Sequence, residues 1–141
     1  MKLKQKLQPQ ILCFTSILFL TGLYFFIMKP QNQQLPYIEY FLATLLIIRT
    51  ITSILFWSNP LQHSTIHKTD AVIAKITILT FMLYTLFYTS YKSSYLFLIL
   101  ALAIAFYASN YYSSIQWTSN EHILSHGLLH ILGAIGTIYA F

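Results

Sequence analysis

Five predominantly apolar segments, each about as long as a bilayer is thick, take up most of the chain. A helix rises about 1.5 Å per residue, so roughly 20 apolar residues cross the hydrocarbon core of a membrane. Of the 141 residues, 57% are hydrophobic and only 8% are charged, which argues against a soluble domain. The sequence therefore predicts an all-α integral membrane bundle that forms a single domain. The five predicted transmembrane helices cover about 11–28, 37–57, 70–90, 94–112 and 121–141.

Polar stretches that contain turn-forming residues separate these segments. The second span ends at 58–60, because the residue before a proline disfavours helix. Residues 61–69 are expected to form a short polar connection, after which Asp70 suits the N-terminus of the third span. Ser119 or Asn120 is expected to cap the fifth helix.

The orientation of the bundle follows from three lysines that precede the first span, Lys2, Lys4 and Lys6. Positive charge favours the cytoplasmic side of a membrane, or the matrix side in an organelle. A basic start before an apolar run is also typical of a signal peptide. Here the run is long, and Lys29-Pro30 and a Gln-rich loop at 31–34 follow it instead of a small-residue cleavage site, so we expect a retained helix. With five spans, the connections at 58–70 and 113–120 lie on the side of the N-terminus.

The last segment carries three histidines at intervals of four residues, His122, His126 and His130. On a helix this spacing places them on one face, about 6 Å apart along the axis per step. Ionisable side chains inside a span usually face the protein interior and meet a partner there. Because His63, His67 and Asp70 belong to the same side of the membrane, we expect the two groups to meet.

Imidazole binds zinc well, and two histidines four residues apart on a helix can hold one ion together. His122 and His130 are about 12 Å apart along the axis, so all three histidines cannot easily bind one metal. We expect His126 and His130 to be the pair, because His122 lies near the water boundary. The spacing therefore predicts a zinc site on the buried face of the last helix.

A third zinc ligand has to come from the segment 58–70, where His63 and His67 are available. We assign it to His67. Asp70 would orient a histidine or hold a metal-bound water, whose pKa a metal lowers to about 7. Two alternatives stay open: the histidines are only polar anchors near the interface, or two of them from different helices ligate a haem iron.

The chain's single arginine, Arg49, lies inside the second predicted span, where it needs a partner. Glu39, Asp70 and a helix carbonyl are candidates, and an anionic lipid head group is another. Lys75 lies within the third span and can extend its ammonium group back to the surface. The positive charges thus act as topology signals rather than as a nucleic-acid-binding surface. Membrane lipids and other membrane subunits are the expected partners.

The order of these motifs resembles the superfamily of alkaline ceramidases and progestin–adiponectin receptors, which are intramembrane zinc hydrolases or look like them. The matching pieces are Ser53-Ile-Leu-Phe-Trp57, His67-Lys-Thr-Asp70 and His126-Gly-Leu-Leu-His130. The resemblance implies that His126 and His130 hold zinc. It also implies that Asp70 binds the metal-bound water, that Ser53 assists, and that the reaction is hydrolysis of a lipid amide.

Two features differ from that superfamily. Its members have seven spans where this chain has five, and Trp57 stands where the superfamily has a third metal-binding histidine. These differences and the small size support a second hypothesis, a non-catalytic subunit of a larger membrane complex. A haem-binding electron-transfer anchor is a third.

Overall fold

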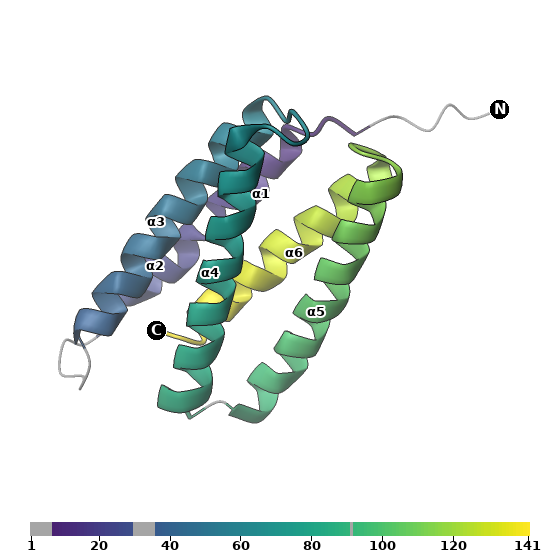
Figure 1. Ribbon diagram of the computed structural model, residues 1–141. Coiled ribbons are helices and arrows are strands. Elements are labelled where there is room, and N and C mark those ends of the chain that lie inside the picture. Colours follow the sequence, from purple (N-terminus) through teal and green to yellow (C-terminus); the bar gives the residue numbers. More distant parts are fainter. Residues whose placement is uncertain (1–6, 30–35, 91) are drawn as a thin grey trace.

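The structure, a computed structural model, describes residues 7–29, 36–90 and 92–141, and all regular secondary structure in these ranges is helical (Figure 1). The helices are α1 (Ile11–Ile17), α2 (Leu20–Met28), α3 (Pro36–Ser58), α4 (Thr65–Tyr88), α5 (Lys92–Ile115) and α6 (Asn120–Ile138). Helices suit a bilayer because each satisfies its own backbone hydrogen bonds. The predicted all-α helical bundle is confirmed.

Four helical stretches are long and apolar enough to cross a membrane: Ile11–Met28, Tyr37–Ser58, Thr65–Tyr88 and Ser93–Ile115. They correspond to the first four predicted spans and indicate an integral membrane protein. The fifth predicted span does form a helix, α6, but among the described residues it does not belong to this set. Its 19 residues include three histidines and Glu121, which leave it a shorter apolar stretch than the other spans have.

The arrangement of the helices gathers three parts of the chain at one end of the bundle (Figure 1). The N-terminal part, the α3–α4 turn and the α5–α6 turn lie together there, and the Leu7 amide donates to Asn120 Oδ1 (2.8 Å). The expected gathering of these connections is therefore confirmed. Lys2, Lys4 and Lys6, and most of the predicted loop at 30–36, lie outside the described residues, so the side that this end faces stays a prediction.

The first span is not one continuous helix, because it turns at residues 18–19 between α1 and α2. Thr15 Oγ1 and Ser16 Oγ both donate to the Leu12 carbonyl, at 3.1 and 2.7 Å. Hydroxyls that bond back to the preceding turn compete with the helix ladder and bend it. Thr15 and Ser16, just before this interruption, both contact His130 of α6.

α4 begins five residues earlier than predicted, at Thr65 rather than near Asp70. Ser64 is the N-cap and accepts a hydrogen bond from the His67 amide (3.2 Å). The prediction of Asp70 at a helix N-terminus, after a loop that reaches 69, was therefore wrong. Asp70 instead lies in the second turn of α4, buried, with 4% of its surface exposed. For α6, the prediction of Ser119 as the cap is confirmed.

α6 runs diagonally across the bundle, between α5 and the α1–α2 segment, and is visible in the gap between α4 and α5 (Figure 1). One stripe of α6 faces outward and consists of Leu124, Leu128, Ile131 and Ile135. The opposite face is buried and carries His122 and His130, which are 1% and 0% exposed. At Gly22 of α2, an added Cβ would lie 2.7 Å from Thr137 Cβ, so α2 and α6 approach closely there.

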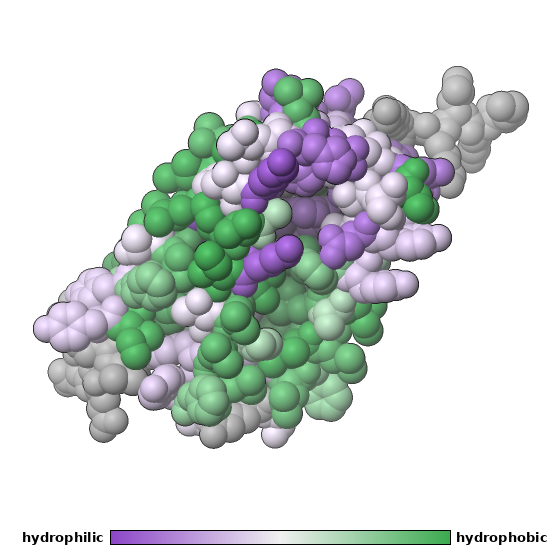
Figure 2. Space-filling model, in the orientation of Figure 1, coloured by the Kyte–Doolittle hydropathy of each residue, from purple (hydrophilic) through white to green (hydrophobic). Residues whose placement is uncertain are grey.

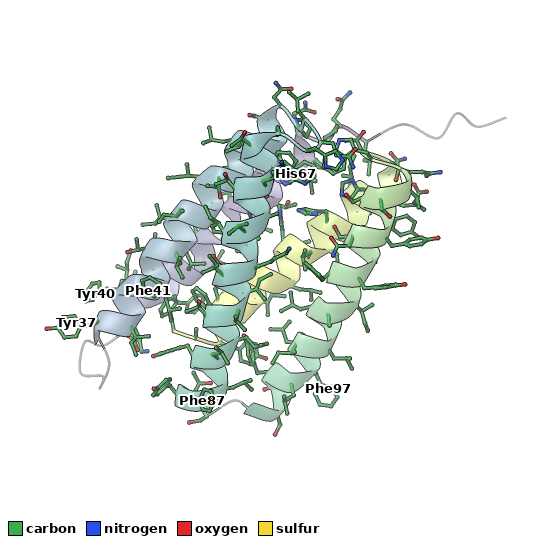
Figure 3. All side chains as sticks on the ribbon, in the orientation of Figure 1. Tyr37, Tyr40, Phe41, His67, Phe87 and Phe97 are labelled. Atoms are coloured by element: carbon green, nitrogen blue, oxygen red, sulfur yellow. The ribbon has the colours of Figure 1, made fainter. Side chains whose placement is uncertain are left out.

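At the end of the bundle away from the histidines, Glu39 is buried and connects three helical segments. It accepts from Lys29 Nζ (2.8 Å), just after α2, and from the Tyr84 hydroxyl (2.6 Å) of α4. Figure 3 shows exposed aromatic side chains, including Tyr37, Phe87 and Phe97, at the periphery of this end. Glu39 is therefore engaged here and does not pair with Arg49.

Candidate functional site

A polar cavity of about 140 Å³ lies at the histidine end of the bundle, bounded by α3, α4, α5 and α6. Its polar lining residues include Arg49, His67, Asp70, Lys75, Ser109, Asn110, His122 and His126. Figure 2 shows hydrophilic residues gathered around a hollow on this face, whereas hydrophobic residues cover the other end. Of the predicted site residues, His67, Asp70 and His126 line this cavity, whereas Ser53 and His130 do not belong to its lining.

A buried ion pair between Arg49 of α3 and Asp70 of α4 lies in the wall of this cavity. Each residue has 4% of its surface exposed, and Arg49 Nη1 donates to Asp70 Oδ1. Of the partners considered for Arg49, the structure selects Asp70. The other terminal nitrogen of Arg49, Nη2, lies 3.4 Å from His130 Nε2. The Arg49 guanidinium carbon lies 5.3 Å from the Phe19 ring centre. Arg49 therefore connects the acid of the third span to a histidine of the last helix.

His130 is fully buried, and both of its ring nitrogens have partners. Nδ1 lies 2.8 Å from Thr15 Oγ1 and 3.4 Å from Ser16 Oγ. Because the Thr15 hydroxyl donates to the Leu12 carbonyl, its oxygen is free to accept from Nδ1–H. Nε2 then carries the lone pair and accepts from Arg49. In this tautomer, the nitrogen that a metal would use is occupied by a guanidinium.

His126 differs from His130 because one of its ring nitrogens lacks a partner. Nδ1 pairs with Ser109 Oγ of α5 (2.8 Å), but Nε2 is buried and pairs with no group in the described part of the chain. The ring centre of Trp57 lies 4.7 Å from that of His126. The Trp57 Nε1–H also has no hydrogen-bond partner among the described residues. An unpaired buried polar group costs about 1–3 kcal/mol. Two such groups side by side at a cavity are therefore a candidate ligand-binding point.

His67 and His122 share a local structure that gives one ring nitrogen of each a hydrogen-bond partner. Each histidine stands three residues after a capping serine, whose hydroxyl accepts from the histidine amide. In return, His67 Nδ1 accepts from the His63 amide (3.0 Å), and His122 Nδ1 accepts from the Thr118 amide (3.2 Å). This reciprocal pattern is similar to a capping box with histidine in the usual place of glutamate, except that each ring accepts from the amide of the residue before the capping serine. Both histidines therefore help to start a helix.

Stacked aromatic rings hold these two capping histidines in place. His67 lies parallel to Phe56, with ring centres 4.7 Å apart, and Trp117 lies between His67 and His122, at 5.1 and 4.8 Å. Figure 3 shows His67 near the end of α4 where the three connections gather. His67 is thus a wall residue of the cavity.

The structure brings together most of the predicted site but not the complete ligand set. The rings of His126 and His130 are adjacent, with centres 4.8 Å apart, and Arg49 links Asp70 to His130. Ser53 is buried beside them and hydrogen-bonds with Ser16 (2.9 Å). His67 does not complete a site with the other two, since the described residues contain no group of three histidine, cysteine or acidic side chains placed to hold a metal.

Several residues of the site were not predicted from the sequence. Thr15, Ser16 and Ser109 are small hydroxyl residues in apolar helices, where their usual partner is the helix's own backbone. Trp117, in the connection between α5 and α6, also lines the cavity. The Ser-x-x-His spacing before both helices was a usable signal, because Ser-x-x-Glu is a known helix start.

Comparison with known proteins finds no matching family model, curated protein or solved structure. The resemblance to ceramidases and progestin–adiponectin receptors therefore depends on the three short motifs.

Proposed function

We propose that this chain is a membrane-embedded hydrolase of lipid amides, similar in its reaction to the ceramidases. The observation that supports the proposal is the meeting of Asp70, His126 and His130 beside a cavity within the bundle. An acid and imidazoles at one depth in a membrane protein are expensive to bury and usually serve function.

The position of the cavity suits a lipid substrate. It shares Lys75, Ile78, Phe106 and Leu129 with a second cavity of about 270 Å³. The lining of this second cavity is mainly apolar and comes from α4, α5, α6 and the junction of α1 and α2. A lipid chain can lie against the apolar lining while its polar group reaches the histidines. The substrate then does not have to leave the bilayer to react.

In the proposed reaction, the oxygen of a water molecule attacks the amide carbonyl carbon, the C–N bond breaks, and the leaving amine takes up a proton. His126 is the ligand or base with an available nitrogen, since its Nε2 lacks a protein partner among the described residues. Zinc binding by His126 and His130 is part of the proposal, and it requires Arg49 to move away from His130 Nε2. Zinc would supply a nucleophilic hydroxide at neutral pH.

The proposal is tested with purified protein, a fluorescent ceramide and measurement of zinc content. We expect one zinc per chain and amide hydrolysis, with both lost in His126→Ala and His130→Ala. His63→Ala is the matched control, because His63 is exposed and its backbone amide, not its ring, supports the helix cap. Hydrolysis at the wild-type rate in both His126→Ala and His130→Ala would exclude the proposed site.

A second function, a non-catalytic subunit of a membrane complex, is favoured by one observation. Arg49 engages both Asp70 and His130, so the acid and one imidazole already have protein partners. In that case the cluster would join α3, α4 and α6 without a reaction. Purification with a constant set of partner chains, together with absence of hydrolysis, would support this alternative.

A further inference from the structure

Lys75 is a cation inside the bundle's third membrane-crossing helix. It lies ten residues after Thr65, the first residue of α4, which is about 15 Å along the axis. Its side chain is exposed and lines both the polar and the apolar cavity. The ion pairs within the described residues are Lys29–Glu39 and Arg49–Asp70, so no protein acid there neutralises Lys75. An ammonium group at this depth needs an anionic partner.

The polar cavity offers hydrogen-bond donors as well as this charge. Trp57 and His126 line it, and the indole Nε1–H and imidazole Nε2 have no partner in the described ranges. Arg49 and Asp70 cancel each other's charge, so with neutral histidines the wall keeps one positive charge, that of Lys75. The chemistry of the wall therefore favours an anionic group that accepts hydrogen bonds.

We propose that the two cavities form one binding site for an anionic single-chain amphiphile. An anionic oxygen accepts hydrogen bonds from Trp57 Nε1–H and His126 Nε2–H, Lys75 balances the charge, and the alkyl chain lies in the apolar cavity. His126 then has the tautomer in which Ser109 donates to Nδ1. Carboxylates and phosphate monoesters share this chemistry. The inference rests on the lipid site of the proposed function but not on hydrolysis, and it describes the metal-free chain, because His126 Nε2 cannot bind zinc and carry a proton at the same time.

The test is direct binding of three probes with one alkyl chain length to the full chain in nanodiscs of zwitterionic lipid. Dodecanoate, dodecyl phosphate and dodecanol are titrated by calorimetry at a pH where the acids are ionised. We expect at least one anion to bind about tenfold or more tightly than the alcohol, because hydrogen bonds and charge pairs to an anion are strong when desolvated. The anion that binds identifies which of the two head groups the site takes.

Variants separate this site from general attraction to a basic protein. Lys75→Met is expected to lower the affinity for the anion about tenfold, to the level of dodecanol, and to leave dodecanol binding unchanged. Lys68→Met is the matched control, since Lys68 is an exposed lysine of the same helix that does not line either cavity. Equal effects of the two substitutions, or equal binding of anion and alcohol, would overturn the proposal. An unchanged affinity in Lys75→Met would mean that Lys75 only extends to the membrane surface.

Two further measurements test the hydrogen-bond donors: the anion affinity of Trp57→Phe and the protonation of His126 Nε2. The substitution removes the indole N–H and keeps an aromatic ring, so we expect it to weaken anion binding several-fold. Nitrogen chemical shifts of labelled histidine should show a proton on His126 Nε2 in the bound state, and a lone pair there would contradict the proposal. Anion binding without hydrolysis would remove only the proposed function. Hydrolysis without anion preference would remove only this inference.

Discussion

At Arg49, one side chain satisfies two groups that the sequence places in different helices. Its guanidinium bonds to Asp70 and approaches His130, and all three residues are almost fully buried. Breaking a buried pair by removing one partner is far more destabilising than replacing both. Pairing with each other therefore allows an acid and an arginine to lie buried in apolar helices.

Arg49→Met is expected to lower the free energy of unfolding by about 3–5 kcal/mol, because Asp70 is left buried without its cation. The double substitution Arg49→Met with Asp70→Asn removes both charges and should be clearly more stable than Arg49→Met alone. Unfolding of the purified protein in detergent measures both. If the double variant is as unstable as the sum of the two single variants, the two residues do not act as a pair.

Among the helices, α6 packs against both parts of the first span, α1 and α2, which are separated at residues 18–19. Thr15 and Ser16, which precede the interruption, contact His130, and close approach at Gly22 brings α2 against Thr137 of α6. Small residues allow such approach in membrane bundles, where dispersion and hydrogen bonds drive helix association. The contacts of α1–α2 with α6 therefore help to hold the histidine face of α6 against the first span.

Gly22→Ala is expected to destabilise the bundle by about 1–3 kcal/mol, because the new methyl group would overlap Thr137. Gly127→Ala is the control: its Cβ would lie an ordinary 3.5 Å from Leu12 Cδ2, and this helical glycine needs no special backbone angle. Thermal unfolding in detergent compares the two. Equal melting temperatures for both variants would show that the α2–α6 approach does not limit stability.

For the whole molecule, the important property is that the polar connections gather at one end and the cavity opens between α4 and α5. These two helices are joined by the turn near residue 90 and diverge toward the other end, with α6 between them (Figure 1). Within the described ranges no other helix covers the exposed sides of α4 and α5, which would face lipid in a bilayer. Such an arrangement allows a bilayer component to reach the histidines.

Cysteine labelling tests this topology in a Cys13→Ala background, with an impermeant thiol reagent on sealed vesicles. Gln62→Cys and Gln116→Cys should be labelled from the same side, because both exposed positions lie in connections at the histidine end. Ser90→Cys should be labelled only from the opposite side. Labelling of positions 62 and 116 from different sides would contradict the gathering of the connections and the site built on it.

Hydropathy and residue spacing were sufficient to predict the helical bundle, the approximate bounds of most helices and the buried face of α6. These properties are local: a bilayer requires long apolar helices, and a four-residue interval keeps His122, His126 and His130 on one face whatever surrounds them. The start of α4 was missed because a serine cap outweighed an aspartate that suited a helix start equally well.

Packing decided which partner each polar side chain meets, and no local pattern carries that information. Arg49 could have paired with Glu39, but Glu39 lies at the other end with Lys29 and Tyr84. Likewise, His67 became part of a helix cap, whereas His126 Nε2, beside Trp57, pairs with no group among the residues that the structure describes. Partners of this kind depend on the depth and rotation of helices relative to one another, which side-chain volumes across the whole bundle set together.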